Sequence, residues 1–160
     1  MKKIILTLFV TLFLTNNLYS AGSSSTSSSS SNYDKAVKLI ESAKKFEQKN
    51  KANKAKKNYL KAQKLLIKSN KNKPNNADTL NYLGFTTRKL GDYVNGEKYY
   101  LQGLDLNPNH TGINEYLGEL YVVTNRIDLA KERLQVLANC KCEEYSELKE
   151  IISGTKKSKY

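Results

Sequence analysis

The stretch that decides the fold runs from residue 77 to residue 110 and reads ADTLNYLGFTTRKLGDYVNGEKYYLQGLDLNPNH. Two short helical patterns flank the tripeptide GDY at 91–93, which favours a turn. Pro108 ends the second pattern, because proline has a fixed φ and lacks the amide hydrogen that a helix needs. The sequence therefore predicts two antiparallel helices joined by a turn.

The same pattern recurs along the chain at a spacing of 34 residues. Leu83 and Gly84 return as Leu117 and Gly118, and the two prolines of the chain are also 34 residues apart. A fixed period of this length is typical of proteins built from repeated helical units. The blocks of the predicted repeat are 43–76, 77–110 and 111–144.

Block 77–110 resembles a tetratricopeptide repeat (TPR) over its whole length, block 111–144 resembles a second, and block 43–76 a divergent first. The resemblance implies an all-α fold, in which antiparallel helix hairpins stack into a right-handed α-solenoid. Each hairpin buries only part of its apolar face, so neighbours must stack to complete the core. An apolar stripe in residues 143–153 predicts a C-terminal capping helix.

Small residues occupy the positions where paired helices would approach most closely. They are Gly84, Gly96, Gly118 and Ala130. We expect them to let two antiparallel helices approach closely.

The N-terminus has the pattern of an export signal. Lys2 and Lys3 precede an apolar run at 4–14, and small residues follow at 20–22. That run is shorter than the roughly 20 residues that span a bilayer. We expect residues 1–21 to be a removed signal, with a retained membrane anchor as the alternative, and the mature chain, without a transmembrane segment, to be periplasmic or secreted.

The remaining segments follow from composition. Residues 22–32 are almost all serine and predict a disordered linker, because they cannot bury enough surface to offset their ordering entropy. We expect the helical domain to cover 33–153 and residues 154–160 to form a basic, disordered tail.

Composition also limits the possible functions. The chain has one histidine and two cysteines, and it lacks the glycine-rich phosphate-binding and nucleophile motifs. We therefore expect no enzyme activity, no cofactor and no metal. The formal net charge of +12 is concentrated in 33–76, where 14 lysines face three acidic residues.

The lysines of that segment have two interpretations. They form either an anion-facing surface for an envelope polymer or lipid, or a solvated helical face without a partner. Nucleic acid is disfavoured because the tyrosines that could stack on bases occupy repeat packing positions. The candidate anion-facing residues are Lys44, Lys51, Lys54, Lys61 and Lys64.

The resemblance also implies a concave groove lined by the first helix of each hairpin. A gradient from basic to acidic along it would suit an extended peptide of mixed charge. We therefore expect a non-catalytic interaction or scaffold module that binds a peptide or partner protein, although the same positions could be ordinary exposed helix residues. The candidate contacts are Asn81, Phe85, Arg88, Lys89, Glu115, Glu119 and Val122.

Two further features carry chemistry. Cys140 and Cys142 allow a structural disulfide, two free thiols, or a redox or copper role, and export favours the disulfide. His110 follows Pro108 in the turn between repeats, where we expect it to cap the turn rather than to take part in catalysis.

Overall fold

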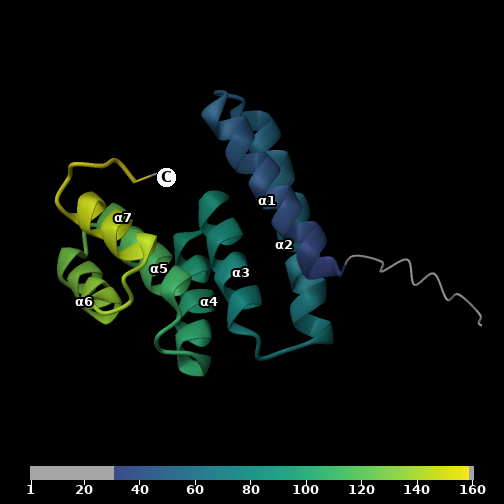
Figure 1. Ribbon diagram of the computed structural model, residues 1–160. Helices are drawn as coiled ribbons and strands as arrows, with labels where there is room; N and C mark the ends of the chain where they lie inside the picture. Colours follow the sequence, from purple (N-terminus) through teal and green to yellow (C-terminus); the bar gives the residue numbers. More distant parts are fainter. Residues whose placement is uncertain (1–30, 159–160) are drawn as a thin grey trace, which may run out of the picture.

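The computed structural model describes residues 31–158, which form seven α-helices and contain no strand (Figure 1). The helices are α1 (Asn32–Gln48), α2 (Ala52–Asn72), α3 (Ala77–Lys89), α4 (Tyr93–Leu106), α5 (Thr111–Val123), α6 (Ile127–Leu137) and α7 (Glu143–Ile152). The predicted export signal at 1–21 lies outside the described residues, as do 22–30 of the predicted linker and the last two residues of the tail. Among the described helices, none is both long enough and apolar enough to cross a membrane.

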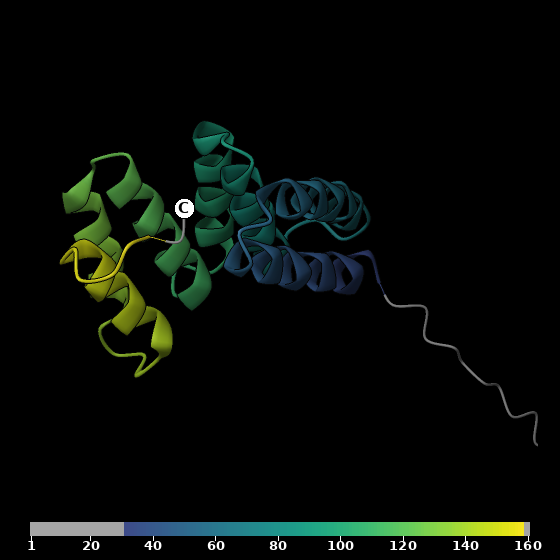
Figure 2. The same ribbon diagram turned by 90° about the horizontal axis from the view of Figure 1, so that it is seen from above.

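Consecutive helices pack in pairs, and the pairs stack along the chain. The hairpins are α1–α2, α3–α4 and α5–α6, while α7 packs against both α5 and α6. Figures 1 and 2 show the α1–α2 hairpin at one end of the array and α6 with α7 at the other. The predicted all-α hairpin repeat is confirmed. We call the face lined by α1, α3, α5 and α7 the groove.

Polar side chains fix where the helices begin. Ser31 and Asp34 form a reciprocal capping box at the start of α1, each accepting a hydrogen bond from the other's backbone N–H. Asn76 and Asp92 cap α3 and α4 through side-chain oxygens. His110, which was expected to cap the turn, caps α5 with its Nδ1 atom.

The first hairpin differs from the prediction. A repeat at 43–76 would place its turn near 57–59, but the chain turns at 49–51, between two helices of 17 and 21 residues. Asn50 adopts a left-handed conformation, with φ of 53°, that asparagine tolerates better than most residues. Lys49 and Asn50, which align with Leu83 and Gly84 in the middle of a first helix, therefore lie in the turn itself, and the hairpin begins at Asn32.

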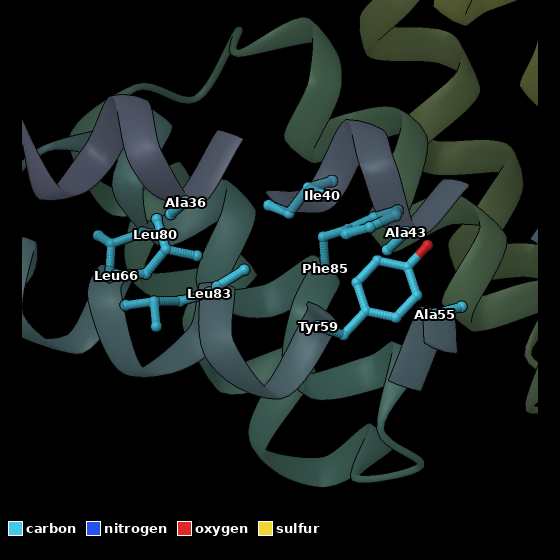
Figure 3. Packing of buried hydrophobic residues seen from close by; sticks show 10 residues of the cluster. Ala36, Ile40, Ala43, Ala55, Tyr59, Leu66, Leu80, Leu83 and Phe85 are labelled. Carbon is cyan, nitrogen blue, oxygen red and sulfur yellow. The ribbon is translucent and has the colours of Figure 1, made fainter. Parts of the chain in front are cut away.

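The core between the first two hairpins is formed by small and aliphatic side chains around two aromatic rings (Figure 3). The rings of Tyr59 and Phe85 meet edge to face, with their centroids 5.8 Å apart. Full burial of each large aliphatic side chain stabilises the fold by about 1.5–3 kcal/mol. The buried members are Ala36, Ile40, Ala43, Ala55, Tyr59, Ala62, Leu66, Leu80, Leu83 and Phe85.

Two of the predicted small positions are required by their neighbours. A Cβ atom on Gly84 would lie 2.5 Å from the ring of Tyr100, and one on Gly118 would lie 2.5 Å from Leu148. A Cβ on Gly96 would be tight against the backbone of α3. Glycine thus allows α4 to approach α3 and the capping helix α7 to approach α5.

Both ends of the domain depart from the predicted boundaries. The predicted linker at 22–32 runs too far, because Ser31 caps α1 and Asn32 is helical. The tail at 154–160 was predicted to be disordered, yet its described part makes specific contacts. Lys156 pairs with Glu147, and the Ser158 hydroxyl reaches Glu119. Charge on the tail and acidity on the groove account for this difference.

Candidate functional site

Acidic side chains from two helices gather around one cavity on the groove face. The cavity has a volume of about 240 Å³ and receives residues from α1, α5 and α7. Four carboxyl groups and a single ammonium group line it, so its walls are strongly polar. We call it the acidic cavity; its lining residues are Lys44, Glu115, Tyr116, Glu143, Glu144 and Glu147.

Lys44 forms the basic side of this cavity and links α1 to α5. Its Nζ atom donates a hydrogen bond of 3.2 Å to the hydroxyl of Tyr116, and it lies 4.8 Å from the centroid of the Phe85 ring. The two rings are 5.0 Å apart, so they form one aromatic surface beneath the ammonium group. Lys44 is therefore half-buried in the groove and does not belong to an outward-facing lysine surface, which corrects that part of the prediction.

Arg88 and Glu119 form an ion pair beneath the groove. Their side chains are each 1% exposed, and Arg88 Nη2 lies 3.3 Å from Glu119 Oε2. Arg88 also donates a 2.7 Å hydrogen bond to the carbonyl of Tyr116. We predicted both residues as direct partner contacts, but they are buried and instead join α3 to α5.

Glu115 and Glu147 bring two carboxyl groups together beside that pair. Burial raises the pKa of Glu115 to about 9, helped by its hydrogen bond with Glu147 and by the charge of Glu119. At neutral pH Glu115 is therefore protonated and can donate to the Glu147 carboxylate. Lys156 supplies Glu147 with a cation at 2.7 Å, and this hydrogen bond raises the pKa of Lys156.

The same three glutamates offer the donor set of a possible metal site. Oxygens of Glu115, Glu119 and Glu147 lie within 4.8 Å of one another. Arg88 and Lys156, however, already place cationic groups against two of these carboxyl groups. The arrangement is therefore better suited to binding ammonium or guanidinium groups than to holding a metal ion.

The other predicted groove residues are largely buried. Asn81 is buried in α3, and Phe85 is packed between the rings of Tyr59 and Tyr116. Lys89 lies near Glu47, with the two side chains paired at 2.6 Å, and burial lowers the pKa of Lys89. The predicted residues thus come together, but as the floor and wall of the groove rather than as its exposed surface.

Val122, the last of the predicted contacts, is half-buried and packs against the core that α4, α5 and α6 share. Its side chain supports the hairpin, and its role as a groove contact stays a prediction.

The remaining candidate lysines do not lie together with Lys44. Lys51 and Lys54 are exposed at the turn of the first hairpin, and Lys61 and Lys64 are exposed along α2. Lys54 also covers the ring of Phe46, at 5.8 Å from its centroid. The predicted set of five therefore separates into one groove residue and four surface residues.

Cys140 and Cys142 are joined by a disulfide in the segment that leads into α7. The sequence left open a structural disulfide, two free thiols, or a redox or copper role, and the structure has the disulfide. Lys141 between them has a positive φ of 49°, so the chain turns sharply before the capping helix begins.

Several residues of the acidic cavity are not marked by any motif in the sequence. We predicted no partner contact at Tyr116, Glu143, Glu144 or Glu147. The spacing of Glu143 and Glu147 does place them on one face of α7, which was a usable signal. Nothing in the sequence indicated that Lys156 would return to this face.

The chain resembles known proteins in its structure and not in its sequence. No family model matches the sequence, and no curated protein matches it significantly. The type III secretion translocator chaperone SycD of Yersinia enterocolitica matches with a TM-score of 0.54 at 16% identity, over 76% of this chain and 83% of that chain. The TPR domain of Arabidopsis OM64 matches with a TM-score of 0.50 at 13% identity, over 78% and 99% of the two chains. At these identities the likeness concerns the fold, and it shows that the described part of the chain has the TPR fold.

Proposed function

We propose that the protein is a non-catalytic interaction module that binds an extended segment of a peptide or partner protein in its groove. The observation that carries this proposal is the convergence of charged side chains from α1, α5 and α7 on one open cavity. SycD, which shares the fold, is a chaperone of a secretion translocator, and the proposed role is of the same kind.

The groove is well organised for recognition. Its floor is fixed by the Arg88–Glu119 pair and by the rings of Phe85 and Tyr116, so little side-chain entropy remains to be lost on binding. Its acidic wall carries Glu143, which is exposed, so a partner can reach its charge directly. An extended chain offers both amides and side chains to such a surface.

The test is a selection from a library of random unstructured peptides, followed by substitution of the acidic wall. Selected peptides should bind the native protein. Their affinity for the double variant Glu143→Gln/Glu147→Gln should be at least tenfold weaker. The control is Glu132→Gln, which removes one exposed carboxylate from α6. Peptides that bind all three proteins equally would contradict groove binding.

We further propose that the mature protein works in the periplasm or is secreted. The pattern at 1–21 supports this setting, and the disulfide of Cys140 and Cys142 is compatible with an oxidising compartment. Cell fractionation with N-terminal sequencing of the mature chain tests it. A chain that begins at Met1 and stays with the cytoplasmic fraction would contradict export.

A second candidate function is adhesion to an anionic envelope polymer or lipid head group. The exposure of Lys51, Lys54, Lys61 and Lys64 favours it. Retention on an anionic surface should fall steeply between low salt and about 0.5 M salt, since screening weakens exposed charges. Replacing the four lysines by glutamine should abolish retention, whereas retention that persists would exclude this role.

A further inference from the structure

We propose that the acidic end of the groove recognises a lysine side chain of an extended basic peptide, and that the tail of this chain occupies the site until a partner displaces it. This inference rests on the proposed function and specifies its ligand. The juxtaposition of Lys156 and Ser158 with the carboxyl cluster of Glu115, Glu119 and Glu147 carries it.

The chain is directed back to the groove by the end of α7. Gly154 adopts a left-handed conformation with φ of 76°, which glycine accepts without strain. The amides of Thr155 and Lys156 then both donate to the carbonyl of Glu150, at 3.0 and 3.1 Å. Figures 1 and 2 show the segment after α7 turning back toward α5.

Two side chains of the returning segment engage the cluster. The Lys156 ammonium lies 2.7 Å from Glu147 and 3.9 Å from Glu150. The hydroxyl of Ser158 donates to Glu119 at 3.5 Å. The returning segment thus contacts the groove through Lys156 and Ser158, while Lys157 between them is exposed.

The chemistry of the cluster selects a cation that donates hydrogen bonds. Four carboxyl groups face one ammonium group around the cavity, and a lysine head group is a compact charge with three donors. The hydroxyl of Tyr100 is fully buried and has no hydrogen-bond partner among residues 31–158, and the centroid of its ring lies 6.0 Å from the guanidinium carbon of Arg88. An unpaired polar group therefore belongs to a ring that lies close to the Arg88–Glu119 pair.

Tail occupancy has a quantitative consequence for any partner. If the groove is open for only a fraction of the time, the apparent dissociation constant rises by the inverse of that fraction. Weakening the docked tail should therefore strengthen binding of a separate basic peptide, without any change in the peptide or in the groove.

The experiment uses three full-length proteins: the native chain, Lys156→Gln, and the matched control Lys157→Gln. Each variant removes one charge from the tail, but of the two lysines only Lys156 is paired with Glu147, whereas Lys157 is exposed. The probe is a synthetic peptide with the sequence of 154–160, GTKKSKY, titrated while NMR shifts of α5 and α7 amides are recorded. The spectra also show directly that each variant is folded.

We expect Lys156→Gln to bind the peptide about fivefold more tightly than the native chain, and Lys157→Gln to resemble the native chain. A peptide with glutamine in place of its first lysine should bind poorly to Lys156→Gln, whereas replacement of its second lysine should have little effect. Equal titration of all three proteins, or an absence of shifts in α5 and α7, would overturn the inference.

The two proposals can fail separately. If library peptides bind the groove without a preference for lysine, and their affinity is the same for the native chain and Lys156→Gln, the groove function stands and the tail inference falls. If no library peptide depends on the acidic wall, the proposed function falls, whatever the tail does.

Discussion

Glu115 lies in a buried and acidic environment that opposes ionisation of its carboxyl group. It is 5% exposed, and its neighbours Glu119, Glu144 and Glu147 all oppose a negative charge on it. Its pKa of about 9 in the folded protein compares with an ordinary value of 4.5. The folded state therefore holds a proton that the unfolded chain releases.

This difference predicts the pH dependence of stability. A group with a raised folded pKa contributes stability that is fully present below pH 4.5 and is lost as the pH rises toward about 9. In Glu115→Gln the free energy of unfolding should depend less on pH between 4.5 and about 9. This variant should therefore be more stable than the native protein at pH 9. Denaturant unfolding across pH 4–10 measures the effect. Glu132→Gln, at an exposed site, should leave the slope unchanged, and an unchanged slope in Glu115→Gln would contradict the assignment.

The Arg88–Glu119 pair makes a second prediction at this scale. Arg88→Met removes the cation beside a buried carboxylate and should lower the free energy of unfolding by about 3–5 kcal/mol. The double variant Arg88→Met/Glu119→Leu should recover most of that loss. The exposed pair of Lys131 and Asp128 is the control, since Lys131→Met should cost less than about 1 kcal/mol. Equal losses in the two single variants would contradict burial of the groove pair.

At the scale of the helices, the sequence predicted the second and third hairpins well but the first poorly. Gly84 and Gly118 recur at 34 residues because each must admit a neighbouring side chain, so packing itself produced the visible period. The first hairpin has a turn at 49–51 without glycine or proline. Its only turn signal was an asparagine in a lysine-rich context, and a period imposed from the later repeats shifted its boundaries.

The candidate site was predictable only in part, because its geometry depends on contacts between helices that are far apart in the sequence. Helical position placed Arg88, Glu115 and Glu119 on the groove side, and the structure does bring them together. Their burial depends on how closely successive hairpins approach, and the contacts of Lys44 with Phe85 and Tyr116 connect three different helices. No local pattern contains that information.

The capping helix supports the acidic wall, which gives a prediction at this scale. Leu148 is fully buried against Gly118, so Leu148→Ala should lower the free energy of unfolding by about 2–5 kcal/mol. Hydrogen exchange should become faster mainly in α7. Ser146→Ala, on the exposed side of the same helix, should have little effect. Unchanged exchange in α7 of the Leu148 variant would show that α7 does not depend on this contact.

On the scale of the whole molecule, opposite charges are separated in space. The first hairpin carries exposed lysines, whereas the groove between α5 and α7 carries a cluster of carboxyl groups. The basic tail joins the second region and covers part of it. A net charge of +12 therefore conceals an acidic surface, which composition alone could not indicate.

The central claim is that partners bind in the groove and not on the outer helices. A photoreactive amino acid at Glu143, on the exposed rim of the acidic cavity, tests it against the same substitution at Lys64 on α2. After irradiation with a selected peptide, mass spectrometry should find the peptide joined to position 143 and absent from position 64. Labelling at position 64 without labelling at position 143 would contradict the account.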